Sequence, residues 1–169
     1  MQLVHSDIYG LISVKARYGA LYFITFIDNY TRFGYVYLIS HKYEVLDYFI
    51  KFLNEVENQL DKKVKALRTD RGRECLSEQF KKLCEEKGII RQLTTPRTLQ
   101  QNGVAKRKNR TLLEIVRSMM AQVNLPIPYW GDALLTATFV LNHVPSKSVS
   151  STLYELWSRK KPNLNDLHL

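Results

Sequence analysis

Two aspartates and one later position have the types and spacing that metal-dependent phosphoryl chemistry uses. Asp7 lies in the first apolar stretch, Asp70 follows a later one, and 35 residues separate Asp70 from position 106. Carboxylate oxygens are the ligands that Mg²⁺ and Mn²⁺ prefer. A third carboxylate at position 106 would complete a two-metal site, which holds both the attacking and the leaving oxygen of a phosphodiester. Asp7 and Asp70 are therefore candidate metal ligands.

Each aspartate also has a simpler interpretation. An aspartate before Arg71 and Gly72 more often caps a turn than binds a metal. An isolated aspartate such as Asp7 is more often a solvated residue at the end of a strand. Only the pair together, on neighbouring strands and followed by position 106 on a helix, favours a catalytic site. The prediction therefore depends on the elements that position these residues.

The first part of the chain predicts three strands joined by turns. Leu3 to Tyr9 alternates loosely and ends at Gly10. Leu21 to Ile27 is a continuous β-branched and aromatic run, typical of a strand buried on both faces. Residues 28–32 have turn chemistry, so Phe33 to Ile39 would complete an antiparallel hairpin.

After residue 43 helices alternate with short strands. The first helix is predicted by apolar residues at three- and four-residue spacing, namely Val45, Leu46, Phe49, Phe52, Leu53 and Val56. We then expect a strand at 64–67, a helix at 77–87 that stops at Gly88, and a strand at 89–93. A long helix begins near position 106. Its predicted apolar stripe is Leu112, Ile115, Val116, Met119 and Val123. Two further helices are expected at 130–142 and 153–158.

This order of elements predicts an α/β fold, with helices on the faces of a mixed, five-stranded sheet. If the first and fourth strands are neighbours, Asp7 and Asp70 project side by side. We predict one domain over residues 1–145, with residues 146–169 as its C-terminal extension.

Composition and charge narrow the class of protein. The 169 residues are 45% hydrophobic and 24% charged, a globular composition without an apolar run long enough to span a bilayer. Lys and Arg number 25 against 16 Asp and Glu, and this excess favours a polyanionic partner, nucleic acid before an acidic membrane. Cys75 and Cys84 form no CxxC motif, so we expect neither a disulfide framework nor a structural zinc site. The first residues lack a secretory signal, so we do not expect secretion.

Seven stretches form a collinear series: His5–Gly10, Tyr22–Tyr30, Leu67–Gly72, Gln101–Ala105, Arg107–Leu112, Pro145–Lys147 and Tyr154–Trp157. With them the sequence resembles the integrase catalytic core of copia-type, plant-like retrotransposons over nearly its whole length. The resemblance implies a ribonuclease-H-like fold, with which the predicted order of elements agrees. It also implies DNA integration, in which 3′-end processing and strand transfer use two Mg²⁺ or Mn²⁺ ions held by two Asp and one Glu.

By this resemblance Asp7 and Asp70 are the catalytic, metal-binding aspartates, and Lys106 occupies the position of the catalytic Glu. A charged lysine cannot ligate a metal. Its ammonium would gain roughly 4 kcal/mol at about 4 Å from either aspartate, at an effective dielectric near 20, and would compete with a metal. Glu114 lies about 12 Å further along the helix and cannot replace the missing acid. We therefore expect weakened metal binding and impaired catalysis.

The resemblance also implies that the loop before the long helix and the start of that helix contact DNA. The predicted DNA-binding residues are Arg97, Gln101, Asn102, Lys106, Arg107, Lys108 and Arg110. Phosphate contacts of this kind would be sensitive to salt and weakly selective for sequence. The simpler interpretation is a solvated basic face of the helix.

Three functions stay open on the sequence. The leading one is an integrase core that acts on retroelement ends and target DNA with impaired catalysis. The alternative is a non-enzymatic, nucleic-acid-binding relic of an integrase, so the sequence does not decide whether the chain is an enzyme. An ordinary ribonuclease H is disfavoured because the Gln-Asn-Gly and Tyr-Glu-Leu-Trp signatures belong to the integrase branch. We expect a homo-oligomer, no membrane partner, and a location in the nucleus or a cytoplasmic particle.

Overall fold

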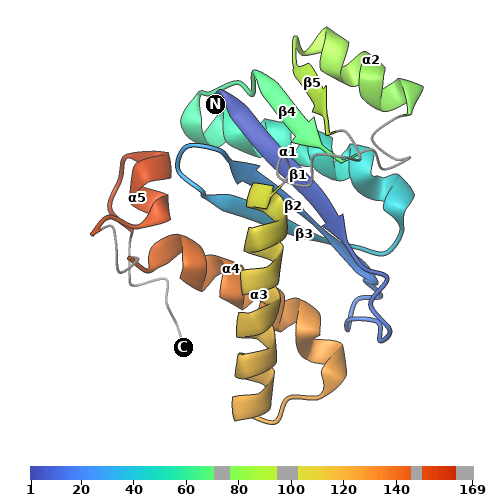
Figure 1. Cartoon of the computed structure of the whole chain (residues 1–169), viewed down its shortest axis with the longest axis vertical. Helices are drawn as coiled ribbons and strands as arrows, with labels where there is room; N and C mark the ends of the chain where they lie inside the picture. Colours follow the sequence, from blue (N-terminus) through green and yellow to red (C-terminus); the bar gives the residue numbers. More distant parts are fainter. Residues whose placement is uncertain (71–76, 95–102, 146–149, 163–169) are drawn as a thin grey trace.

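The computed structural model describes residues 1–70, 77–94, 103–145 and 150–162, and its five strands form one mixed sheet (Figure 1). The strands are β1 (Leu3–Tyr9), β2 (Tyr22–Asp28), β3 (Gly34–Ile39), β4 (Ala66–Thr69) and β5 (Ile90–Leu93). Their order is β3-β2-β1-β4-β5, with β1 to β3 antiparallel and both β4 and β5 parallel to β1. The predicted α/β fold is confirmed, and the first and fourth strands are neighbours.

Helices cover both faces of this sheet (Figure 1). They are α1 (Val45–Leu60), α2 (Glu78–Glu86), α3 (Gly103–Gln122), α4 (Trp130–His143) and α5 (Leu153–Ser158), with short 3-10 turns at Lys42–Glu44 and Ile127–Tyr129. α3 packs on β1 and β2, and α4 packs on α3 and β3. In the described part of the chain, no helix is long and apolar enough to cross a membrane.

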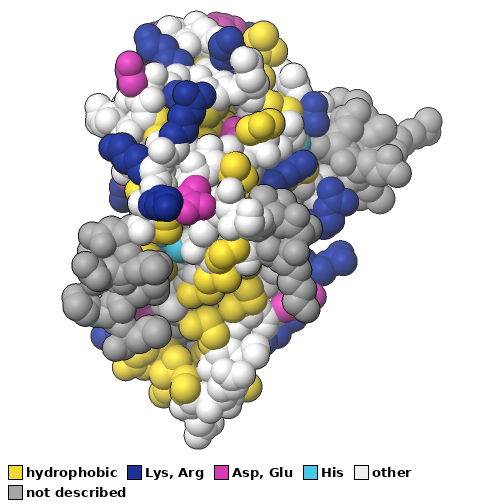
Figure 2. Space-filling model, turned by 90° about the vertical axis from the view of Figure 1, so that its left-hand side faces the viewer, with side chains coloured by type: hydrophobic (Ala, Val, Ile, Leu, Met, Phe, Trp, Pro, Cys, Tyr) yellow, Lys and Arg dark blue, Asp and Glu magenta, His cyan; other side chains and the backbone are white. Residues whose placement is uncertain are grey.

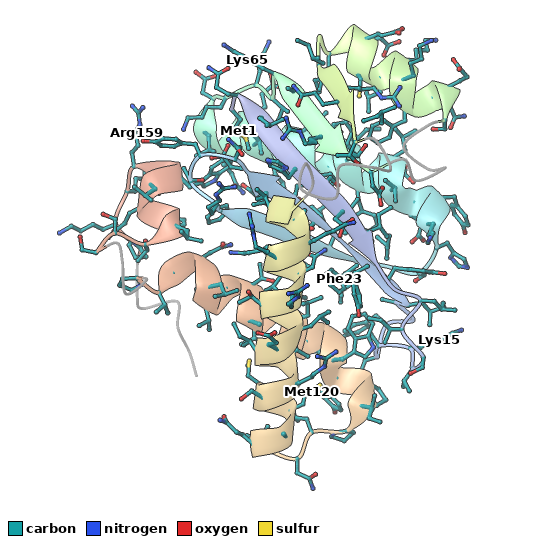
Figure 3. All side chains as sticks on the ribbon, viewed as in Figure 1. Met1, Lys15, Phe23, Lys65, Met120 and Arg159 are labelled. Atoms are coloured by element: carbon teal, nitrogen blue, oxygen red, sulfur yellow. The ribbon has the colours of Figure 1, made fainter. Side chains whose placement is uncertain are left out.

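Alternation along β2 divides the hydrophobic core into two layers. Ile24 and Phe26 belong to the layer beneath α1, where Phe49 and Phe52 of the predicted apolar stripe are fully buried. Phe23 points to the other face and joins the layer formed with α3 and α4. Figure 3 labels Phe23 at the sheet and Met120 near the far end of α3. The period of two along a strand therefore determines which helices each residue contacts.

Some details of the predicted elements are wrong. α3 begins at Gly103 rather than near position 106. β4 begins at Ala66 rather than at residue 64, because its parallel register with β1 starts at the pair Leu3 and Ala66. Val123 is 66% exposed instead of extending the apolar stripe of α3. The helix ends at Gln122, and Asn124, with a φ of 50°, lies in the turn that leads to α4.

A buried asparagine fastens α4 to the beginning of β3. Asn142 Nδ2 donates to the Gly34 carbonyl at 2.8 Å, and the Gly34 amide donates to Asn142 Oδ1 at 3.2 Å. The Asn142 side chain therefore satisfies both backbone groups of Gly34 in a place where water is excluded.

The substitution Asn142→Ala is expected to lower the free energy of unfolding by about 2–3 kcal/mol. It leaves two buried backbone groups without partners, and each such group costs about 1–3 kcal/mol. Urea denaturation measures the effect. The control is Asn58→Ala on the exposed side of α1, which should stay within about 0.5 kcal/mol of the parent. Equal losses in the two variants would contradict a specific role for Asn142.

Candidate active site

The sheet brings the two candidate aspartates together. Asp7 lies in β1, and Asp70 directly follows β4. The parallel register pairs His5 with Arg68. The same register, continued by two residues, sets Asp70 opposite Asp7. The strand order that a carboxylate pair requires, with β1 and β4 as neighbours, is therefore present.

α3 adds an amide and a cation to this pair. Asn109 is 2% exposed, and its Nδ2 donates to Asp7 Oδ2 at 3.1 Å. Its Oδ1 is buried and has no hydrogen-bond partner within the described residues. Lys106 lies one turn earlier on the same helix. It borders a hollow of about 370 Å³, which we call the Asp7 hollow; its lining residues are Asp7, Tyr9, Lys106, Asn109, Arg110, Leu113 and Arg117.

The pKa of Asp7 depends more on its burial than on any neighbouring charge. The pKa of Asp7 is raised to about 6, first by burial of the carboxylate and second by the charge of Asp70. The Lys106 ammonium and the Asn109 hydrogen bond lower the pKa, yet they do not offset the loss of hydration. Lys106 is itself exposed, so water screens its attraction. Lys106 therefore acts on Asp7 from the edge of the hollow, and more weakly than the roughly 4 kcal/mol of a pair about 4 Å apart at an effective dielectric near 20.

Residues 1–98 match the family model described as the integrase core domain. The chain belongs to this family. It is 39% identical over 168 residues to the retrovirus-related Pol polyprotein from transposon TNT 1-94 of Nicotiana tabacum, and 34% identical over 147 residues to the transposon Ty1-NL2 Gag-Pol polyprotein of Saccharomyces cerevisiae. These relatives confirm the resemblance to copia-type retroelement integrases.

The chain spans only part of these relatives. It covers 13% of the tobacco polyprotein and 8% of the yeast polyprotein, while 99% and 86% of the chain are matched. A solved intasome of simian T-cell lymphotropic virus, in complex with PP2A regulatory subunit B56 gamma, contains a chain that matches 96% of this one. The match covers 55% of the viral chain, with a TM-score of 0.75 and 17% identity. At this identity the likeness confirms the integrase, ribonuclease-H-like fold alone.

The integrase core family generally uses a divalent metal, but the residues present here do not fit a two-metal centre. Within the described ranges, no group of three or more His, Cys, Asp or Glu side chains lies close enough to hold a metal ion. Asp7 and Asp70 are two carboxylates, and Asp7 Oδ2 already accepts a hydrogen bond from Asn109. Lys106 places a positive charge beside them. Two divalent ions would therefore face too few negative ligands.

The predicted DNA-binding residues of this integrase core divide into three groups. Lys106 and Arg110 border the Asp7 hollow, whereas Arg107 and Lys108 lie on the other side of α3 and border a separate hollow. The remaining three residues, Arg97, Gln101 and Asn102, lie outside the described residues. The basic stretch at the start of α3 is therefore two surfaces rather than one.

Asn109 and Arg117 also border the Asp7 hollow, and neither was predicted as a site residue from the sequence. The sequence contains a signal that could have indicated a role for Asn109. It lies on the buried stripe of α3 with Ala105, Leu112 and Val116, where a polar side chain needs a partner. Arg117 gave no such signal, because a lone arginine on an exposed helix surface is ordinary.

The substitution Asp7→Asn is expected to stabilise the protein at neutral pH. Asp7 has a folded-state pKa of about 6, above its ordinary 3.8. The contribution of Asp7 to the free energy of unfolding is most favourable below pH 4. This contribution falls by up to about 3 kcal/mol as the pH rises from 4 through 6. Asparagine has no charge to bury and still accepts the hydrogen bond from Asn109. The advantage of Asp7→Asn should therefore be full at pH 7.5 and vanish near pH 4.

Urea denaturation at several pH values measures this difference. The control is Asp61→Asn, which removes an exposed carboxylate at a left-handed residue that asparagine tolerates. An advantage of Asp7→Asn that does not change with pH would contradict the assignment of the effect to the buried charge.

Proposed function

We propose that this integrase core binds retroelement ends and target DNA, and that it is impaired in metal-dependent 3′-end processing and strand transfer. The observation behind the proposal is the position of Lys106, which borders the Asp7 hollow and acts electrostatically on Asp7. The site has an ammonium group in the place where the resemblance requires a third carboxylate.

The charges around the Asp7 hollow support binding of a phosphodiester. Lys106, Arg110 and Arg117 contribute three positive charges, against the two carboxylates of Asp7 and Asp70. An arginine can donate two parallel hydrogen bonds to a phosphate, and a lysine adds a point charge. The net positive charge favours DNA without a bound metal.

The chemical step lacks part of its machinery. When bound, a divalent metal supplies a nucleophilic oxygen and neutralises charge on the phosphoryl group. Asp7 and Asp70 are the residues that would hold one ion, and Asn109 orients Asp7 through its hydrogen bond. Lys106 donates hydrogen bonds and cannot ligate a metal while charged. The second ion therefore lacks the carboxylate that the resemblance places at position 106 of α3.

Two measurements on the same preparation test the proposal. Fluorescence anisotropy with labelled duplex DNA should show binding without Mg²⁺, with an affinity that falls steeply with salt. A nicking and strand-transfer assay on the same duplex should show no product that depends on Mg²⁺ or Mn²⁺. Metal-dependent products would overturn the proposed impairment. Absence of DNA binding would overturn the DNA-binding function and with it both remaining interpretations of the chain.

The alternative, a non-enzymatic DNA-binding relic, predicts the same DNA binding but no activity even after the third acid is restored. We extend the leading proposal to self-association of the core and to a site of action in the nucleus or a cytoplasmic particle. Sedimentation of the protein with and without duplex DNA tests the self-association.

A further inference from the structure

The geometry of α3 separates its basic residues into two flanks. Its buried stripe, centred on Ala105, Leu112 and Val116, faces the sheet. At 3.6 residues per turn, Lys106 and Arg110 project about 100° and 140° to one side of that stripe. Lys108 and Thr111 project about 60° and 120° to the other side, and Arg107, about 160° from the stripe, lies on the exposed face beside Thr111. The helix therefore has a basic surface on each flank.

The second flank closes against the turn between β2 and β3. There a hollow of about 290 Å³, which we call the Arg32 hollow, is lined by Ile27, Arg32, Val104, Arg107, Lys108 and Thr111. Among the described residues that line it, the charged side chains are cations, and Thr111 adds a hydroxyl group. In Figure 2, Lys and Arg side chains are spread over the upper part of the face and also lie along its right-hand side, which is the front of Figure 1.

The turn that presents Arg32 is held in one conformation. Asp28 Oδ2 accepts hydrogen bonds from the Thr31 amide and hydroxyl, both at 2.8 Å. The Arg32 amide donates to the Asp28 carbonyl at 3.0 Å, and Arg32 itself has a φ of 65°. Because Thr31 and Asp28 are buried, the backbone of Arg32 is fixed before any ligand arrives.

Lys108 is the residue that most needs an anion. Its stem passes over Gly34, where an added Cβ would lie 3.4 Å from Lys108 Cε. Burial lowers the pKa of Lys108 to about 8. None of the residues that the structure describes forms a salt bridge with Lys108, Arg107 or Arg32. A half-buried ammonium that has no counter-charge among these described residues is unfavourable, and a bound anion would offset that penalty.

We propose that the Arg32 hollow binds a backbone phosphate of DNA, so that α3 contacts DNA phosphates on both of its flanks. A phosphate accepts bidentate hydrogen bonds from arginine and single ones from lysine and a hydroxyl group, which are the donors present. The choice of DNA as the ligand rests on the proposed function. Capture of a phosphate in this hollow is independent of Asp7 and of any metal.

Duplex DNA binding across a salt series tests the inference. Lys108→Met and Arg107→Gln should each weaken binding and reduce the slope of log affinity against log salt by about 0.9, the value for one lost phosphate contact. Arg110→Gln reports on the Asp7 flank, and Lys81→Gln removes an equal charge from an exposed position on the distant helix α2. If the Arg107 and Lys108 variants match Lys81→Gln while Arg110→Gln weakens binding, the Arg32 hollow is not a DNA site. If no α3 variant differs from Lys81→Gln, the proposed DNA-binding face fails as well.

Two further measurements separate binding from folding and identify the ligand. Lys108→Met should keep or raise the melting temperature because it removes a buried charge, so weaker DNA binding with intact stability supports a binding role; a large loss of stability would overturn it. In NMR titrations, the Thr111 amide should shift with both inorganic phosphate and duplex DNA. A shift with inorganic phosphate alone would assign the hollow to a free anion and overturn the DNA proposal.

Discussion

The substitution Lys106→Glu is expected to create Mg²⁺ binding in the Asp7 hollow and to give metal-dependent DNA nicking where the parent has none. It replaces a cation that acts on Asp7 with a third carboxylate on the same helix turn. The summed charge of Asp7, Asp70 and position 106 changes from −1 to −3, against the +4 of two divalent ions. Restoring the acid therefore supplies the ligand that α3 lacks.

The size of the effect can be read from stability as well as from activity. Without metal, a third carboxylate near Asp7 and Asp70 adds repulsion, so Lys106→Glu should melt below the parent. Mg²⁺ at a hundred times its dissociation constant would stabilise the folded state by about 2.7 kcal/mol. For a domain of this size, that is a rise of about 5–10 °C in melting temperature. The parent should show little change with Mg²⁺.

The control Lys106→Gln separates the two roles of the lysine. It removes the competing cation and adds no carboxylate, so it should bind at most one ion weakly and remain inactive. Isothermal titration with Mg²⁺ compares the three proteins directly. If Lys106→Glu binds Mg²⁺ but stays inactive, the relic interpretation is favoured. If it neither binds Mg²⁺ nor changes its melting temperature with Mg²⁺, Lys106 is not the cause of the impairment.

The substitution Trp157→Ala is expected to cost about 3–5 kcal/mol of folding free energy, the range for removing a buried large aromatic side chain. Trp157 of α5 is 3% exposed and belongs to the core layer beneath α1. Its ring stacks on Phe33 with a centroid distance of 5.2 Å and an interplanar angle of 3°. It also meets Tyr35 edge to face at 6.0 Å. A short C-terminal helix therefore completes the cover of the β2–β3 hairpin.

Thermal and urea unfolding of Trp157→Ala and Trp157→Phe measure this contribution. The phenylalanine variant should retain most of the stacking and lose less. Tyr30→Ala, which truncates an aromatic side chain that is 87% exposed, is the matched control and should change stability little. Unchanged stability in Trp157→Ala would mean that α5 does not contribute to the stability of the core.

The predicted boundary at residue 145, between the domain and its C-terminal extension, stays a prediction.

Much of the fold could be predicted because local sequence signals agree with the tertiary packing. β1 and α5 have the predicted bounds. For α5 the reason is a capping box, in which the Thr152 hydroxyl accepts from the Glu155 amide and the Glu155 carboxylate accepts from the Thr152 amide. Gly88 ends α2 as predicted, with a φ of 66°. The beginning of β4 could not be predicted, because pairing with a distant strand determines it.

The candidate site was predictable in part for the same reason. The aspartate pair follows from strand order, and the position of Lys106 follows from helix spacing. The hydrogen bond from Asn109 to Asp7 joins residues that are 102 positions apart, and no periodicity indicates which strand a helix will cross. Arg32 is unremarkable in the sequence as well. Only the packing of α3 on β1 and β2 places it beside Arg107 and Lys108.

The parallel pairing of β1 with β4 has a consequence for the order of folding. His5 and Arg68 pair across 63 positions of sequence, whereas the β2–β3 hairpin closes a loop of a few residues. Longer loops are entropically more expensive to close, so we expect the hairpin to form before β4 docks. We further expect Asp7 and Asp70 to become neighbours late in folding, after the rate-limiting barrier. Relief of their repulsion, as in Asp7→Asn, should therefore slow unfolding and leave the rate of folding almost unchanged. The burial of charge in this site thus shortens the lifetime of the native state and does not delay its formation.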